Sequence, residues 1–124
     1  MAINNTVRVV RVFAGATFAK NAGVDAVVDV SALIGSTVGK FCYQYSCTSA
    51  GAAVVDITYT MSVDGVTYFA PGTTMVKEAI TPASSTETGG AEYDFEFAPF
   101  LKFNVAETDN VAAVTNFDMW IAFG

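Results

Sequence analysis

Apolar and polar residues alternate almost without error between Ala53 and Val63, and this pattern restricts what the 124-residue chain can fold into. The apolar side chains occupy every second position: Val55, Ile57, Tyr59, Met61 and Val63. A period of two places them on one face, which predicts a half-buried antiparallel strand. Asp64-Gly65 follows and leads into residues 66–69, which predicts a tight hairpin with a type I′ turn.

The same alternation recurs along most of the chain and predicts seven to nine short strands. Besides the strand just described, they are expected at residues 6–13, 24–30, 38–47, 66–69, 73–80, 93–97, 101–105 and 111–123. Residues 14–23 and 81–90 are expected to form loops, the second one mobile, and residues 31–35 a short helical turn. One sheet could not bury so many aromatic side chains. We therefore expect a single-domain, all-β antiparallel β-sandwich over residues 1–124, jelly-roll or immunoglobulin-like, whose strand order stays open.

The composition is typical of a protein that hides apolar surface against neighbours. Hydrophobic residues make up 52% of the chain and charged residues 15%, against roughly 25% charged in an average soluble protein. So little charge favours burial of apolar surface between subunits. The net charge of −6, without a basic cluster, argues against direct binding to nucleic acid or to an anionic membrane.

The first residues lack the basic start and apolar run of a secretory signal peptide. The apolar runs elsewhere are too short for a transmembrane helix. We expect synthesis in a cytoplasm without export by the usual route, which leaves the final location open.

Cys42 and Cys47 lie five residues apart within one predicted strand. An odd separation places the side chains on opposite faces, with Cα atoms about 17 Å apart at roughly 3.3 Å per residue. Disulfide-bonded residues have Cα atoms about 4.4–6.8 Å apart. A regular strand therefore predicts two free thiols with Cys47 buried, whereas a bulge or turn between them would permit a disulfide.

The chain contains no histidine, so Ser-His-Asp and Cys-His catalytic arrangements are absent. Among the carboxylates, Glu92, Asp94 and Glu96 share one strand face and would be the candidates for a glycosidase pair. Strand periodicity favours the simpler interpretation that they form a solvated face. The ligand spacing of a calcium loop is missing around Asp64 and Asp109. We predict that the chain is not an enzyme and has no catalytic residue, metal or cofactor.

The stretch from Ile3 to Val12 carries apolar residues on both faces, which is typical of a covered strand. Residues 1–12 are expected to form an N-terminal arm or an edge strand, able to add to the sheet of a neighbour. The predicted interface residues are Ile3, Val7, Val10, Val12 and Trp120. A closed homo-oligomer such as a trimer is expected.

Glycan binding is the alternative function, since sugars stack on exposed aromatic rings. Trp120 shares a strand parity with Asn116 and Asp118, and Tyr68 follows the predicted hairpin. Both rings are candidate stacking platforms, although lone aromatic side chains near strand ends are also enriched at protein interfaces.

Two stretches carry a resemblance to known proteins. Residues 62–69 read Ser-Val-Asp-Gly-Val-Thr-Tyr-Phe, and residues 99–105 form a Pro-aromatic-Leu-Lys-Phe-x-Val strand before an apolar C-terminal strand. Across roughly residues 38–123 the chain resembles the small β-sandwich structural proteins of tailed bacteriophages: capsid decoration proteins, head-fibre bases and minor tail components. The resemblance implies a non-enzymatic virion protein, of decoration or cement type first. It also implies assembly with itself or with a phage capsid or tail protein, after synthesis in the host cytoplasm.

Overall fold

The computed structural model of the chain describes residues 8–30, 40–71, 77–80, 82, 85–94 and 98–123. These residues form eight strands: β1 (Arg8–Phe18), β2 (Gly23–Asp29), β3 (Lys40–Ser49), β4 (Val55–Ser62), β5 (Lys77–Ile80), β6 (Thr86–Asp94), β7 (Phe100–Glu107) and β8 (Val114–Phe123). The described part of the chain contains no helix. The predicted all-β fold is confirmed.

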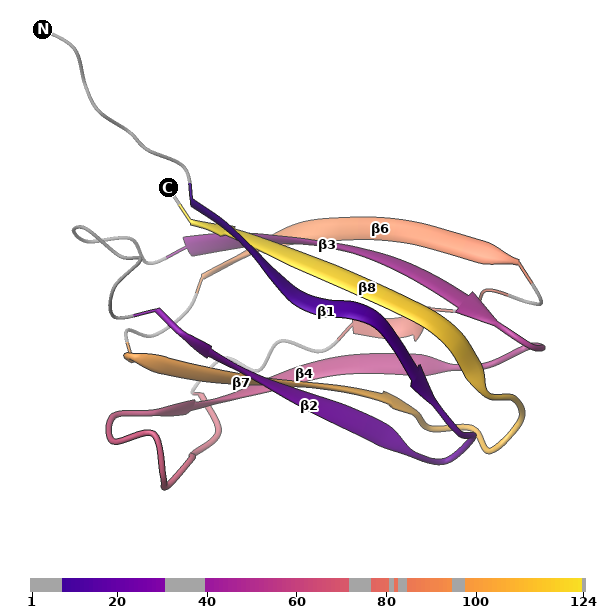
Figure 1. Cartoon of the computed structure of the whole chain (residues 1–124), viewed down its shortest axis with the longest axis horizontal. Helices are drawn as coiled ribbons and strands as arrows, with labels where there is room; N and C mark the ends of the chain where they lie inside the picture. Colours follow the sequence, from indigo (N-terminus) through magenta and orange to yellow (C-terminus); the bar gives the residue numbers. More distant parts are fainter. Residues whose placement is uncertain are drawn as a thin grey trace, which may run out of the picture.

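Two four-stranded sheets face each other (Figure 1). Sheet A has the order β1-β8-β3-β6, and sheet B has the order β2-β7-β4-β5. Successive strands change sheet, except that β5 stays beside β4. This is the strand order of a jelly roll, in which two Greek keys wrap around one core. The jelly roll is therefore the sandwich that forms, and the immunoglobulin-like alternative is wrong.

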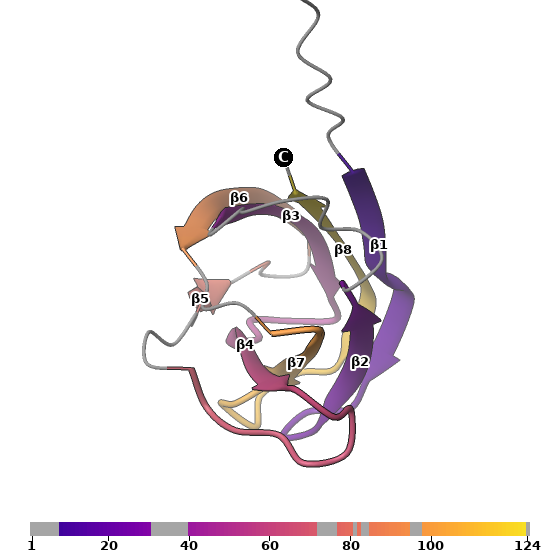
Figure 2. The ribbon, with the colours of Figure 1, turned by 90° about the vertical axis from the view of Figure 1, so that its left-hand side faces the viewer.

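The edges of sheet A differ in their surroundings. The chain turns directly from β1 into β2, which closes one side of the sandwich, while β6 forms the opposite edge of sheet A (Figure 2). Arg8 pairs with Phe123, so β1 begins beside the residue at which β8 ends.

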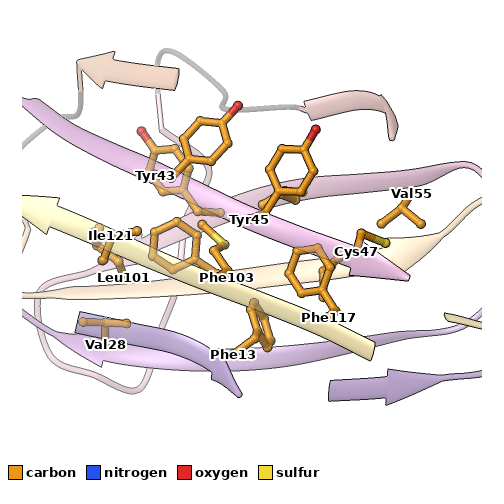
Figure 3. Packing of buried hydrophobic residues seen from close by; sticks show 14 of the residues in the cluster. Phe13, Val28, Tyr43, Tyr45, Cys47, Val55, Leu101, Phe103, Phe117 and Ile121 are labelled. Atoms are coloured by element: carbon orange, nitrogen blue, oxygen red, sulfur yellow. The ribbon is translucent and has the colours of Figure 1, made fainter. Parts of the chain in front are cut away.

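The core lies between the two sheets and consists of the inward-facing side chains of alternating positions (Figure 3). In β4 the predicted face is buried, with Ile57 at 0% and Tyr59 at 2% exposure. Aromatic rings connect three neighbouring strands of sheet A: Phe117 of β8 contacts Phe13 of β1 edge-on at 5.6 Å and stacks with Tyr45 of β3 at 6.4 Å between ring centroids.

Bulges in β1 explain why both parities of its sequence are apolar. Arg11 pairs with Trp120 and Phe13 with Met119, so Val12 is an extra residue that β8 does not match. Such a bulge moves the following residues to the other face, and Phe13 is accordingly 5% exposed. The predicted end of the strand at Phe13 is wrong, because the strand continues to Phe18 through a second irregularity near Gly15, whose φ is 63°.

The predicted type I′ hairpin at Asp64-Gly65 is also wrong. That turn requires positive φ at both central residues, whereas within residues 63–67 only Gly65, at 76°, has one. The segment is a wider loop, closed by two backbone hydrogen bonds of 2.9 Å between Met61 and Phe69.

The predicted loop at residues 81–90 is a strand from Thr86 onward, paired with β3. A Cβ atom at Gly90 would lie 2.3 Å from the carbonyl oxygen of Tyr43, and one at Gly89 2.6 Å from the hydroxyl oxygen of Tyr45. These glycines therefore permit close approach of two strands rather than a turn. The helical turn expected at residues 31–35 lies outside the described residues.

Candidate interaction surface

Most of the large exposed apolar residues belong to the loop after β4 or to the parts of β1 and β2 at the same end of the sandwich, where β1 begins and β2 and β4 end (Figure 1). They are Val9 at 64% exposure, Val27 at 55%, Val63 at 71%, Val66 at 82% and Phe69 at 46%. We call these five residues the apolar end. Val63, Val66 and Phe69 share one loop, whereas Val9 lies on the outer face of sheet A and Val27 on that of sheet B. Exposed apolar groups on one loop are typical of an interaction site.

Asp64 fixes the loop that carries most of the apolar end. Its Oδ1 atom accepts the backbone N–H groups of Val66 at 2.8 Å and Thr67 at 2.9 Å, and the hydroxyl of Ser62 at 2.9 Å. The Ser62 hydroxyl oxygen in turn accepts the N–H of Gly65 at 2.9 Å. The bonds from Val66, Thr67 and Ser62 lower the pKa of Asp64. The valine side chains are thus presented on an ordered loop, which reduces the entropy lost on binding.

Arg11, Trp120 and Asp118 form a cluster on the outer face of sheet A. The Arg11 guanidinium carbon lies 5.2 Å from the centre of the Trp120 ring, and its Nη2 atom lies 2.5 Å from Asp118 Oδ1. Asp118 also accepts the N–H of Gly15 at 2.7 Å and the amide of Asn116 at 3.0 Å. Burial opposes ionisation of Asp118, but these donors outweigh it and lower the pKa. Trp120 lies on the face predicted for it, and the Arg11 guanidinium of the same chain covers one side of its ring.

Tyr68 lies on the other side of the molecule. Its ring is contacted by the Lys102 ammonium at 4.2 Å from the centroid, and Lys102 projects from the outer face of sheet B between the buried residues Leu101 and Phe103. The structure therefore does not bring Trp120 and Tyr68 together, and they do not form one glycan site.

The structure describes two of the four other predicted interface residues. Val10 and Val12 are partly buried and pack against the core of their own chain, so Val9 is the exposed apolar residue at the start of β1. Ile3 and Val7 lie outside the described residues. Sequence reasoning missed Val63 and Val66 as surface residues, although Val66 directly follows Gly65 in a turn, where polar residues are common.

Where the structure describes the acidic strand face, at Glu92, it is open rather than a cleft. Glu92 is exposed on β6, at a shallow depression of about 430 Å³ that Cys42, Gln44 and Thr88 also line. Asp94 is the last residue of β6, and Glu96 lies outside the described residues. No three His, Cys, Asp or Glu side chains of the described segments are grouped to hold a metal ion. In the same segments no helix could span a membrane.

The two cysteines are free, as predicted for a continuous strand. Cys42 is exposed on the outer face of β3, and Cys47 is fully buried on its inner face. Burial, together with the negative charge of Glu87, raises the pKa of Cys47 to about 12. The same two causes raise the pKa of Tyr45, whose hydroxyl donates to Glu87 at 3.3 Å, to about 12.

Glu107 is a buried carboxylate, 2% exposed, at the end of the sandwich opposite the apolar end. It accepts the backbone N–H groups of Asn21 and Asn110, each at 2.7 Å, and that of Val111 at 3.3 Å. Burial opposes its ionisation, but the bonds from Asn21, Val111 and Asn110 outweigh burial and lower its pKa. The hydrogen bonds described above all come from backbone N–H groups, so the Glu107 carboxylate holds the surrounding loops in place.

Comparisons with known proteins add a structural likeness. No family matches the chain, and no curated protein matches it. Among solved structures, the chain is similar to a protein of Bacillus endospore appendages, described as a novel family of disulfide-linked pili. The identity is 16%, the alignment covers 99% of this chain and 94% of that chain, and the TM-score is 0.40. The strand order above, and not this likeness, defines the jelly roll.

Proposed function

We propose that the chain is a non-enzymatic structural subunit of a virus particle, in the first place a decoration or cement protein of a tailed bacteriophage. It acts by burying apolar surface against further copies of itself and against a major capsid or tail protein. The virion is then its final location, and a closed homo-oligomer such as a trimer its assembled form. The sequence resemblance to phage structural proteins supports the choice of particle.

The observation that carries this proposal is the exposure of Val63 and Val66 on a loop that Asp64 holds in place. Two such side chains on a mobile loop would lose conformational freedom on binding, whereas an ordered loop has already lost most of it. Burial of a valine side chain contributes about 1.5–3 kcal/mol. Burial of the two valines on this loop therefore supplies free energy for assembly, and such a role needs no catalytic site.

Residues 1–7 are part of the same proposal, through Ile3 and Val7. A deletion that tests them has to stop at residue 7, because Arg8–Phe18 is β1 and pairs with β8. Removal of residues 1–7 should weaken docking and leave the far-ultraviolet circular dichroism of the sandwich unchanged.

Light scattering of the purified chain over a wide concentration range tests the assembly. We expect oligomers for the wild type and a lower average mass for the Val63→Ser/Val66→Ser double variant. Val111→Ser is the matched control, because Val111 is 49% exposed but lies at the opposite end. Immunogold electron microscopy of particles from producing cells tests the location. A wild-type chain that remains monomeric and labels no particle would show that the proposal is wrong.

Glycan binding is a second proposal, now restricted to Trp120 with its polar neighbours Asn116 and Gln44 on the outer face of sheet A. Binding to a glycan array that is lost in Trp120→Ala and kept in Tyr68→Ala would support it. A broad array without binding would count against it.

A further inference from the structure

The two edges of sheet A carry opposite charge. β1 contains Arg8 and Arg11 and no acidic residue, whereas β6 contains Glu87, Glu92 and Asp94 and no basic residue. The strand order places β1 and β6 at opposite edges. One copy of the chain therefore offers a basic edge and an acidic edge to its neighbours.

The strand directions allow these edges to meet. All three neighbouring pairs of sheet A are antiparallel, so β6 runs antiparallel to β1. A second copy shifted sideways along the sheet brings its β1 beside β6 in antiparallel orientation, and the alternation of directions continues unbroken. Joining two identical edges instead would bring edges of like charge together, which is unfavourable.

The surface beside β6 has room for the side chains of an added strand. Gly90 has no side chain, and the depression of about 430 Å³ lies between Thr88 and Glu92. On the facing edge of a second copy, the outward side chains are Val9, 64% exposed, and Arg11, whose side chain is half exposed beside Asp118. Residues opposite each other in antiparallel strands have Cβ atoms about 4.5–5.5 Å apart. In the register that sets Val9 opposite Glu92, Arg11 lies opposite Gly90 at the depression, and its long side chain reaches Glu92 diagonally.

We infer that β6 of one copy pairs with β1 of the next, so that sheet A continues from subunit to subunit. This inference rests on the proposed function as a self-assembling subunit and names the two surfaces that join. The contact is head-to-tail, so it closes into a ring or extends as a filament, according to the rotation between subunits. The carboxylates of β6 restrict pairing to a basic strand, as charged edge strands commonly do.

Disulfide trapping tests the pairing. In a Cys42→Ser background, Val9→Cys and Glu92→Cys are combined in one chain. Within one copy these positions are separated by Ala122 and Cys42 along successive cross-strand neighbours. Three strand spacings amount to roughly 14 Å, beyond the reach of an internal disulfide. Oxidation should give a ladder of covalent oligomers beyond the dimer, whereas each single variant should give dimers at most.

A second pair combines Val9→Cys with Thr88→Cys. This pair leaves the charge of Glu92 in place and tests a different register on the same face of β6. Gln44→Cys with Val9→Cys is the matched control, since Gln44 is exposed on the same face but lies on the inner strand β3. The inference is overturned if neither edge pair gives more crosslinking than the control.

Charge reversal gives an independent readout. Glu92→Lys should raise the concentration needed for half-assembly about tenfold, which corresponds to about 1.4 kcal/mol. Asp109→Lys makes the same charge change at an exposed residue of the β7–β8 loop and should leave assembly unchanged. If the wild type assembles and Glu92→Lys behaves like Asp109→Lys, the edge pairing is wrong and the proposed function stands. If the wild type does not assemble at all, both fail.

Discussion

Glu107 Oε1 lies 2.7 Å from the backbone nitrogen of Asn21, 86 residues away in the sequence. The same oxygen accepts the N–H of Asn110 at 2.7 Å. Both asparagines have positive φ, 55° and 53°, a conformation that costs free energy in residues other than glycine. One buried carboxylate thus holds the β1–β2 turn and the β7–β8 loop together.

Glu107→Gln should lower the free energy of unfolding by about 1–3 kcal/mol. Glutamine keeps the shape of the side chain but turns one acceptor oxygen into an amide nitrogen, which faces backbone N–H donors. Urea denaturation followed by circular dichroism measures the loss. Asp109→Asn, at an exposed carboxylate two residues on, should change stability by less than about 0.5 kcal/mol. Equal effects of the two variants would contradict the role of Glu107.

Acid should destabilise the fold, because the pKa values of Asp64, Glu107 and Asp118 are all lowered in the folded chain. Each carboxyl binds a proton more weakly when folded than when unfolded. The stabilisation is therefore present above the unfolded pKa of about 3.9–4.3 and is lost as the pH falls through the folded pKa. The urea midpoint should fall below about pH 4. Asp118→Asn should flatten this dependence, and a midpoint that rises in acid would contradict it.

Alkylation should distinguish the two thiols. With a pKa of about 12, Cys47 has roughly one thiolate in ten thousand at about pH 8, and its side chain is also buried. Iodoacetamide should therefore add once to the native chain, at exposed Cys42, and twice in urea. Intact mass followed by peptide mapping locates the adduct. Modification of Cys47 in the native chain at the rate of Cys42 would show that the inner face of β3 is open.

Gly90→Ala should destabilise the chain by about 1–3 kcal/mol, the usual cost of overpacking. The Cβ atom of the new alanine would lie 2.3 Å from the carbonyl oxygen of Tyr43, so the backbone of β6 or of β3 has to move. Gly51→Ala is the matched control, because its nearest neighbour is the Ala112 methyl group at 3.1 Å. Thermal unfolding compares the two, and a smaller loss for Gly90→Ala than for Gly51→Ala would contradict the close approach of β6 to β3.

Alternation in the sequence predicts the regular strands well. In β8 it correctly buries Met119 and Ile121 and turns Trp120 outward. It fails in β1, because the extra residue at Val12 is defined by the partner strand β8, which no local pattern contains. It fails again at Gly89-Gly90, since consecutive glycines indicate a turn until the opposite strand is known.

The candidate surface was harder to predict than the fold. Trp120 and Tyr68 were both recognisable as surface aromatic residues, but only the tertiary arrangement places them on different sheets. Val63 extends the apolar parity of β4, so it was expected on the buried face, and it is 71% exposed because the strand has already ended at Ser62. A period of two says which side chains share a face, but not where the neighbouring sheet stops covering it.

The pairing of Arg8 with Phe123 makes the two ends of the folded unit neighbours in one sheet. A few glycines joining these ends would give a circularly permuted gene, with new termini opened in the β3–β4 connection at the far side. A payload fused after β8 would emerge at the corner where β1 enters, which suits the chain to use as a compact display scaffold.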